Sequence, residues 1–366
     1  MRRIRYIWEQ PAWPDFDWDD TRLLAPLAAV SHKHGQFLGR MAGLGFDLRL
    51  EAQVAAVAEE TLKTSEIEGE HLNAASVRSS VAKRLGLAEA GLRHKDRTVD
   101  GVVEVMVDAT AHAGKSLTKA RLLAWHASLF ADGPVNIRVG AFRRDDDGPM
   151  QVVSGRLGRQ TVHYEAPPAP RVAKEVAAFL AWFNGPSEGD GLLRAAIAHL
   201  WFVTIHPFDD GNGRLSRAIG DMALAQLEGS QQRFYSVSSQ IQRERADYYD
   251  VLEQTQKSVL DVTAWLVWFL GCFGRAIDAA EVESHKVLQK AEFYRRFALE
   301  PLSERQKKVI NRLFADFDGA LTAKKWAALG KCSVDTAQRD ITDLVARGLL
   351  RKNAGGSKNT SYALTA

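Results

Sequence analysis

The chain has 366 residues, of which 25% are charged, and its formal net charge is only +3. This balance excludes a molecule that binds nucleic acid through its overall charge, and the two cysteines are too few for a disulfide framework. No signal-like apolar core follows the first residues, and no run of about 18 apolar residues occurs. We therefore expect a soluble, cytoplasmic protein with no membrane partner.

Residues 1–110 predict an N-terminal module made of an aromatic arm and several helices. Two prolines exclude a helix over residues 5–20, and we expect the rings of this arm to pack on their own domain rather than to line a ligand groove. From Thr21 to about Leu92 the apolar spacing is helical, with a break near Gly43.

Within this module, one predicted helix ends at Gly69. An apolar stripe precedes that end, made of Val54, Val57, Ala58 and Leu62. Thr64 and Glu68 lie in the last turn. Taken alone, they indicate only a helix end with an exposed glutamate.

The middle of the chain predicts more helices and a β-hairpin. Helical patterns cover Val99–Ala111, Leu117–Phe130, Val172–Phe183 and Leu192–Ile205. Two β-like runs, Met150–Val153 and Thr161–Tyr164, are joined by a glycine-bearing segment and predict a hairpin with an exposed edge.

The segment from His206 to Arg217 reads H-P-F-D-D-G-N-G-R-L-S-R and joins two of the predicted helices. Its glycines let backbone amides converge on one point beside a helix N-terminus, which predicts an anion cradle. Two arginines on one helix face can grip phosphate oxygens. A carboxylate suits Mg²⁺, and a histidine titrates near neutral pH. A plain surface turn would not need all of these groups together.

This segment resembles the signature of the Fic family, His-x-Phe-x-(Asp/Glu)-Gly-Asn-Gly-Arg-x-x-Arg, and matches it at every defined position. The family moves AMP from ATP to a protein hydroxyl, so the resemblance implies ATP as substrate and Mg²⁺ as cofactor. It implies His206 as general base, Phe208 as a core anchor and Asp210 as the metal ligand. The implied ATP-binding residues are Gly211, Asn212, Gly213, Arg214, Leu215, Ser216 and Arg217.

The resemblance also implies the architecture: a mainly α Fic helical bundle with a small β-hairpin flap, assigned here to residues 111–285. In the family the flap holds the target protein as an added strand. A helix expected over Ile241–Gln256 edges the adenosine pocket, where we favour Tyr249 over Tyr248 as the base contact. An equal alternative is that both tyrosines only pack against neighbouring helices and contact no nucleotide.

A second resemblance concerns the helix that ends at Gly69. The family's inhibitory motif is (Ser/Thr)-x-x-x-Glu-(Gly/Asn), and Thr64, Glu68 and Gly69 fill it. In the family this glutamate pairs with the last arginine of the signature, which is Arg217 here. The resemblance therefore implies inhibition from the N-terminal side, with ATP held out of line for attack.

Residues 286–366 predict a linker helix and a basic C-terminal module. The apolar helix expected over Val262–Phe273 precedes a charged helix over Ala276–Glu300. Residues 301–366 hold 12 Lys/Arg against 6 Asp/Glu and follow the order of a winged helix-turn-helix, a module found in many Fic proteins. The residues expected to face DNA are Thr336, Gln338, Arg339, Arg351, Lys352 and Lys358. Protein docking is an equal alternative.

We therefore expect an auto-inhibited protein adenylyltransferase that modifies a Tyr, Thr or Ser hydroxyl of a target protein or of itself. One alternative is a DNA-binding regulator whose Fic core senses nucleotide. Another is a Fic enzyme that transfers a different phosphate-containing group. The sequence does not decide whether Glu68 also supports removal of AMP from the target. It also does not decide whether the protein forms a homodimer.

Overall fold

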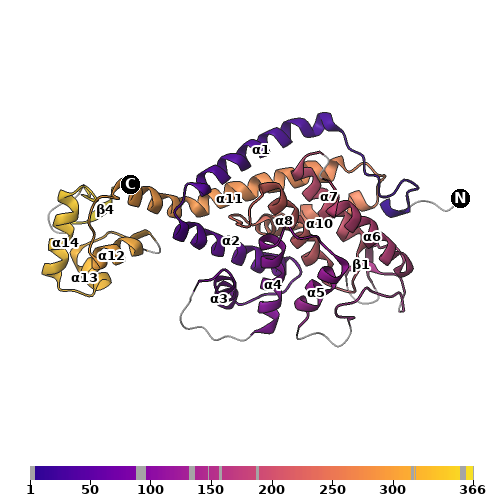
Figure 1. The fold of residues 1–366 in the computed structure, drawn as a ribbon, viewed down its shortest axis with the longest axis horizontal. Helices are drawn as coiled ribbons and strands as arrows, with labels where there is room; N and C mark the ends of the chain where they lie inside the picture. The colour runs from indigo at the N-terminus through magenta and orange to yellow at the C-terminus, as the bar shows by residue number, and fades with distance from the viewer. Residues whose placement is uncertain are drawn as a thin grey trace. The chain divides into compact units, whose positions relative to one another are not determined.

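The computed structural model describes residues 5–87, 96–131, 137–146, 148–155, 159–186, 189–314, 317, 319–354 and 360–365, and the expected positions Leu92 and Lys358 lie outside them. The fold is mainly helical, as predicted (Figure 1). The chain divides into two compact units. The first comprises Met1–Met41 and Leu50–Ala280, and the second comprises Ala42–Arg49 and Glu281–Ala366.

The aromatic arm packs on its own domain, as expected, and its contacts there are at the base of the hairpin. It contains one turn of 3₁₀ helix, η1 (Ile7–Glu9). Tyr6 and Trp8 are buried against Tyr164 and Ala166, and the Trp8 indole donates a hydrogen bond of 2.8 Å to the carbonyl of Glu165. The arm is thus part of the first unit's core.

The N-terminal helices are α1 (Asp20–Ala42), α2 (Phe46–Ile67), α3 (Ala74–Arg84) and α4 (Arg97–Ala111). The second half of α2 buries polar groups as well as apolar ones. Glu60 is 3% exposed and accepts hydrogen bonds from Ser236 Oγ at 2.7 Å and from the Ser238 amide at 3.0 Å. Because such buried bonds orient a helix strictly, α2 is held in one position against the rest of the unit.

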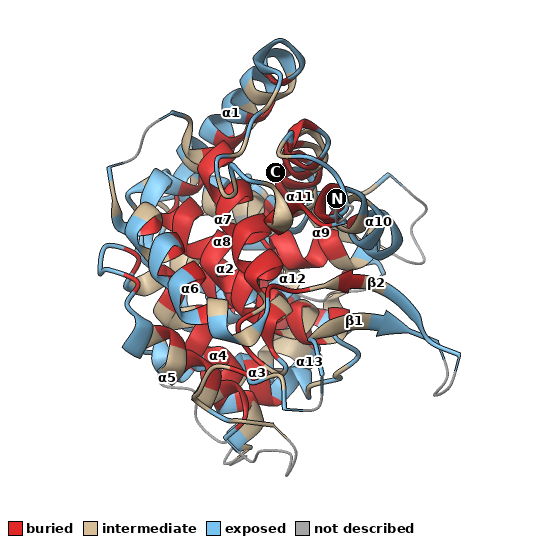
Figure 2. Ribbon diagram, turned by 90° about the vertical axis from the view of Figure 1, so that its right-hand side faces the viewer, coloured by how far each residue is buried: buried red, intermediate tan, exposed pale blue. Residues whose placement is uncertain are grey.

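The centre of the first unit is an antiparallel helix pair, α7 (Gly191–Ile205) and α8 (Asn212–Glu228). Nearly every residue of α7 is buried, and both helices are drawn mostly in the buried colour (Figure 2). Around the pair lie α5 (Lys119–Leu129), α6 (Ala169–Asn184) and the antiparallel hairpin of β1 (Gln151–Ser154) and β2 (Thr161–Glu165), with a register shift between Val152 and Val153. The signature segment, His206–Arg217, forms the loop between α7 and α8 and continues into the first turns of α8.

Two helix predictions were wrong in their boundaries. The single helix expected over Ile241–Gln256 is two helices, α9 (Val237–Arg243) and α10 (Arg245–Gln256), because Glu244 leaves the helical region with φ −109° and ψ 30°. Conversely, the two segments expected over residues 262–300 form one helix of 34 residues, α11 (Thr263–Arg296). The change from apolar to charged residues alters what this helix packs against but does not interrupt its hydrogen bonds.

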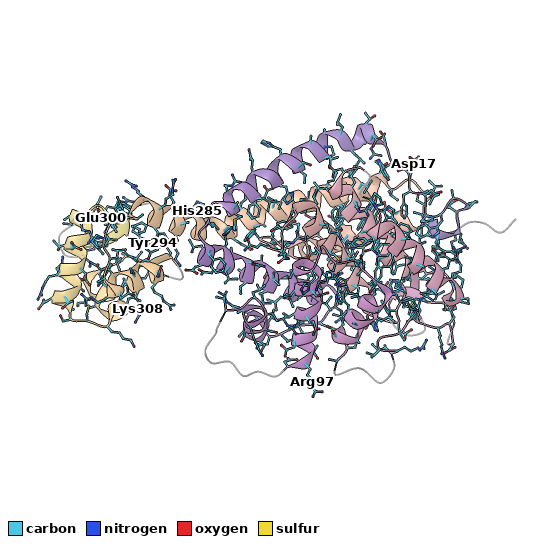
Figure 3. All side chains as sticks on the ribbon, in the orientation of Figure 1. Asp17, Arg97, His285, Tyr294, Glu300 and Lys308 are labelled. Atoms are coloured by element: carbon cyan, nitrogen blue, oxygen red, sulfur yellow. The ribbon has the colours of Figure 1, made fainter. Side chains whose placement is uncertain are left out.

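The second unit has three short helices followed by a hairpin: α12 (Glu304–Phe314), α13 (Ala323–Gly330), α14 (Val334–Ala346), β3 (Leu350–Lys352) and β4 (Tyr362–Leu364). The strands pair antiparallel, with Leu350 opposite Leu364. The core of this unit centres on Trp326, Ile341 and Phe293. Tyr294, labelled in Figure 3, donates a hydrogen bond of 3.0 Å to Asn311 of α12. Among all the described residues, no helix combines the length and apolar content needed to cross a bilayer.

Candidate active site

The signature loop begins with His206, which terminates α7 in a left-handed conformation with φ 50° and ψ 59°. Its amide still donates to the carbonyl of Phe202 at 3.1 Å, so the helix continues up to this residue and then turns sharply. A left-handed conformation is unfavourable for a residue with a Cβ and persists only where the surroundings impose it. Here the buried C-terminal end of α7 imposes this conformation on His206.

The hydrogen bonds of the His206 ring determine its tautomer. Nδ1 lies 3.2 Å from the carbonyl of Val203. Since a carbonyl only accepts, Nδ1 carries the proton, and Nε2 of the neutral ring is left with the lone pair. Burial lowers the pKa of His206 to about 4, and the positive charge of Arg143 acts in the same direction. Near neutral pH the ring is therefore an unprotonated base.

The turn of the loop is closed by Asn212 and Phe208. Asn212 accepts from the Phe208 amide at 3.0 Å and donates to its carbonyl at 2.8 Å. The Phe208 side chain has no exposed surface and stacks on the His126 ring with the centroids 4.1 Å apart. The loop is thus anchored from below by an aromatic pair.

His126 was not singled out from the sequence, yet it supports the loop directly. Its Nδ1 accepts from the Gly140 amide at 2.9 Å, so its proton must be on Nε2, which donates to the Asp210 carbonyl at 3.2 Å. Burial lowers its pKa, which favours this neutral ring. No motif marks this role, because it depends on a contact between α5 and a loop 84 residues further along the chain.

The two aspartates of the loop differ in their surroundings. The Asp209 carboxylate accepts from the Arg138 amide at 2.9 Å, whereas Asp210 is exposed and its Oδ1 accepts from the neighbouring Gly211 amide at 2.5 Å. The described residues contain no cluster of three or more potential metal ligands. A single exposed carboxylate suits Mg²⁺ that takes its other ligands from phosphates and water.

The glycines of the loop are required by its shape. Gly211 has φ 79°, and a Cβ added there would lie 3.0 Å from the Phe130 ring. It is the N-cap of α8, whose N-terminus provides partial positive charge for an anion. Leu215 and Ser216 have fully buried side chains, and Ser216 donates to the Gly213 carbonyl at 2.8 Å. Only their backbone could therefore contact a phosphate.

Arg217 is 4% exposed and is held by the end of α2. Its Nε donates to Thr64 Oγ1 at 2.7 Å, and its Nη2 donates to the Thr64 carbonyl at 2.8 Å and to Glu68 Oε1 at 2.7 Å. The ion pair expected between Glu68 and Arg217 is thus present. A Cβ built on Gly213 would lie 2.1 Å from Glu68 Oε1. The carboxylate therefore rests against the glycine turn itself.

Arg214 is held by a second carboxylate that sequence reasoning missed. Its Nη1 donates to Glu70 Oε2 at 2.7 Å, and its guanidinium lies 5.0 Å from the centroid of the Phe130 ring. The signal available in the sequence was a further glutamate, Glu70, directly after the motif that ends at Gly69.

The two tyrosines of α10 have different surroundings. Tyr248 is 1% exposed and shares a hydrogen bond of 3.0 Å with Nε2 of the buried His199, whose pKa is lowered by burial to about 3. Tyr249 is 36% exposed, with the Arg245 guanidinium 5.4 Å from its ring centroid. Tyr249 is the one that a nucleotide could reach.

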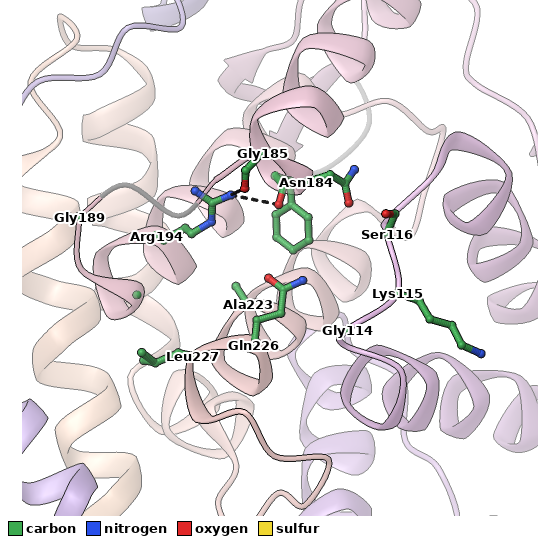
Figure 4. A pocket seen from close by; sticks show the side chains of 12 residues that line it. Gly114, Lys115, Ser116, Asn184, Gly185, Gly189, Arg194, Ala223, Gln226 and Leu227 are labelled. Carbon is green, nitrogen blue, oxygen red and sulfur yellow. Dashed lines mark hydrogen bonds between the residues drawn. The ribbon is translucent and has the colours of Figure 1, made fainter.

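The hairpin is tied to α10 by a chain of polar contacts. Ser154 Oγ lies 2.6 Å from His163 Nε2, and His163 Nδ1 lies 2.6 Å from Glu253 Oε2. A separate cavity of about 330 Å³ lies at the opposite ends of α7 and α8 from the loop, between Arg194 and Gln226 (Figure 4). The Arg194 guanidinium there donates to carbonyls at the end of α6, including that of Trp182 at 2.8 Å.

The helix pair with its glycine turn, histidine and two arginines lies within a segment that matches a known family. Residues 116–224 match the Fic/DOC family, and residues 6–87 match a domain of unknown function, DUF4172. Residues 116–224 therefore form a Fic/DOC domain.

Two relatives and two solved structures illustrate the likeness. The protein adenylyltransferase Fic of Nematostella vectensis is 31% identical over 134 residues, covering 36% of this chain and 30% of that protein. The uridine 5'-monophosphate transferase of Xanthomonas campestris pv. campestris is 28% identical over 145 residues, covering 36% of this chain and 25% of that protein. The chain thus spans less than a third of either relative.

The structural likeness extends over more of the molecule. A Fic family protein from Desulfovibrio desulfuricans G20 has a TM-score of 0.56 at 22% identity, covering 93% of this chain and 96% of that one. A Fic domain containing signaling protein from Bacteroides thetaiotaomicron has a TM-score of 0.52 at 15% identity, covering 71% and 97%. At these identities the likeness concerns the fold.

Proposed function

We propose that this protein transfers AMP from ATP to a hydroxyl of a protein, and that Glu68 inhibits the transfer. The observation that carries the proposal is the arrangement of the loop. A neutral histidine with its lone pair on Nε2 stands at one end, and a glycine turn with two buried arginines stands at the other. A base beside an anion cradle is what nucleotidyl transfer to a hydroxyl requires.

In the proposed reaction, the hydroxyl oxygen attacks the α-phosphorus of ATP, and the bond from that phosphorus to the bridging oxygen breaks. Pyrophosphate leaves, and the hydroxyl proton passes to His206 Nε2. Asp210 would hold Mg²⁺, which neutralises phosphate charge when bound. The Gly211–Gly213 turn and Arg214 and Arg217 would bind the phosphates, and stabilisation of the charge that develops there is the largest expected contribution.

The inhibitory role follows from the position of the Glu68 carboxylate. Glu68 Oε1 takes an Nη2 donor of Arg217 and rests against Gly213, so it lies where a phosphate oxygen would otherwise bind. ATP would then bind with its α-phosphorus out of line for attack. The hairpin of β1 and β2 would hold the target segment as an added strand, and Tyr249 would contact the base.

A test compares ATP labelled at the α-phosphorus with ATP labelled at the γ-phosphorus, in the wild type, Glu68→Gly and His206→Ala. We expect the α-label alone to appear on protein, most strongly in Glu68→Gly and not in His206→Ala. Labelled UTP, run in parallel, tests the alternative suggested by the name of the Xanthomonas relative. Transfer of the γ-label, or equal labelling in His206→Ala, would contradict the proposal.

The second unit supports an additional role in DNA binding. Gln338 and Arg339 are exposed on α14, and Arg351 and Lys352 are exposed on β3, while Lys358 lies outside the described residues. An exposed arginine and glutamine on this helix, beside a hairpin strand with two exposed basic residues, are the groups that a winged helix presents to a major groove and its phosphates.

The DNA-binding role is tested by anisotropy of a labelled duplex at several salt concentrations. Arg339→Ala should weaken binding and reduce the salt dependence, because one phosphate or base contact is lost. The exposed Lys307→Ala on α12 is the matched control. Equal affinity of the two variants would assign any DNA binding elsewhere.

A further inference from the structure

The end of α2 is a rigid cap that carries two carboxylates. Gly69 has φ 83°, its amide donates to the Glu66 carbonyl at 3.0 Å, and the Glu70 amide donates to the Ser65 carbonyl at 3.0 Å. These two bonds are those of a Schellman motif, which determines the backbone on both sides of the glycine. The backbone at Glu68 and Glu70 is therefore fixed, and so are the positions from which their two side chains extend.

The second carboxylate contacts a buried arginine of the signature. Glu70 Oε2 and Arg214 Nη1 are 2.7 Å apart, the Glu70 side chain is 41% exposed, and the Arg214 side chain is 1% exposed. The Arg214 Nε is buried and has no partner among the described residues. This guanidinium therefore has a buried N–H donor that could form a hydrogen bond with an anion.

We propose that Glu70 is a second inhibitory carboxylate, which occupies Arg214 as Glu68 occupies Arg217. This inference rests on the proposed function, because it assigns Arg214 to the phosphates of the nucleotide. A triphosphate that is to contact both arginines must then displace two carboxylates that stand on one cap. Each carboxylate also repels the phosphates, since no more than a few ångströms separate it from the arginine that they would bind.

The same contact would also suit a different role for Glu70, in which it orients Arg214 and remains in place when nucleotide binds. The two roles give opposite signs. If Glu70 competes with phosphate, removing its charge strengthens nucleotide binding. If Glu70 orients the arginine, removing it weakens binding, as Arg214→Ala would. The exposure of Glu70 favours competition, because a half-exposed carboxylate can leave the arginine for water at little cost.

The test measures ATP affinity by isothermal titration calorimetry, with Mg²⁺ present, for Glu70→Gln and Glu70→Ala in the wild type and in Glu68→Gly. Glu66→Gln is the matched control: it changes the net charge equally, and Glu66 pairs with Lys63 at 2.8 Å on the same helix end. We expect both Glu70 variants to bind ATP about fivefold more tightly than their parents, and Glu66→Gln to bind as its parent does.

Gly69→Ala offers a second test that leaves both carboxylates in place. A Cβ there would meet nothing within 4 Å, so the variant acts only through the unfavourable φ of 83°. It should loosen the cap and also tighten ATP binding. Thermal unfolding of every variant checks that the fold is kept.

The outcomes separate this inference from the proposed function. Tighter ATP binding in the Glu70 variants supports the inference even if no label is transferred to protein, which would overturn the proposed function alone. AMP transfer that rises in Glu68→Gly, with ATP affinity unchanged or weakened in both Glu70 variants, would overturn the inference and leave the proposed function standing.

Discussion

The signature loop and the cap of α2 meet at two arginines, but they are built differently. The loop is anchored in the core: Phe208 has no exposed surface, and Arg214 and Arg217 are nearly as buried. The cap presents its carboxylates at the edge, with 30% of the Glu68 side chain and 41% of the Glu70 side chain exposed. The proposed catalytic geometry is therefore held by packing, whereas the proposed inhibition would depend on charges that solvent can reach.

The largest effect is expected where the loop meets the substrate. His206→Ala, made in Glu68→Gly so that activity is high, should reduce AMP transfer by roughly 10²–10⁴-fold, because it removes the base. ATP affinity should be unchanged, since the ring acts on the hydroxyl. A residual rate above about a hundredth of the parent would rule out the general-base role.

The next largest effect is on stability. Phe208→Ala removes a fully buried ring that stacks on His126, and should lower the free energy of unfolding by about 3–5 kcal/mol. Glu68→Gly should lower it less, because the pair is partly exposed and Arg217 keeps both bonds to Thr64. Urea unfolding of the two variants compares loop and cap directly. A greater loss in Glu68→Gly would contradict the contrast between them.

Removing the Glu68 carboxylate from the cap should raise the rate of AMP transfer. Glu68→Gly should increase AMP transfer by roughly ten- to a hundredfold, the equivalent of one charge-assisted hydrogen bond, and Arg217 should be required for the gain. The measurement is a cycle of four proteins: wild type, Glu68→Gly, Arg217→Ala and the double variant. A gain that survives the loss of Arg217 would show that the pair does not inhibit.

The smallest effect is expected from pH. The pKa of His206 is about 4, below the ordinary value for histidine, so its neutral form persists as the pH falls from 8 to about 5. Activity is present above this pKa and is lost as the pH falls through it. The value of kcat/KM should therefore stay nearly flat over that range, where an ordinary histidine would lose activity near pH 6.5. In Glu68→Gly the fall should come lower still, because the Glu68 charge raises the pKa.

The sequence by itself determined the features that depend on neighbours in the chain. The helices around the loop follow from apolar spacing, and the chemical types needed for a phosphate cradle lie within His206–Arg217. The pair of Glu68 and Arg217, 149 residues apart, was predicted only because both positions belong to family motifs. Periodicity was less successful at Glu244, where a local departure from helical angles divides an otherwise regular pattern.

Only the tertiary structure determines the protonation states and the contacts of the site residues. The tautomer and low pKa of His206 come from the Val203 carbonyl and from burial, neither of which a sequence pattern records. The support of the loop by His126 and the contact of Glu70 with Arg214, 144 residues apart, arise where α5 and the end of α2 pack beside α8. The physical reason is common to all three: burial and hydrogen-bond partners are set by segments that meet only after the chain has folded.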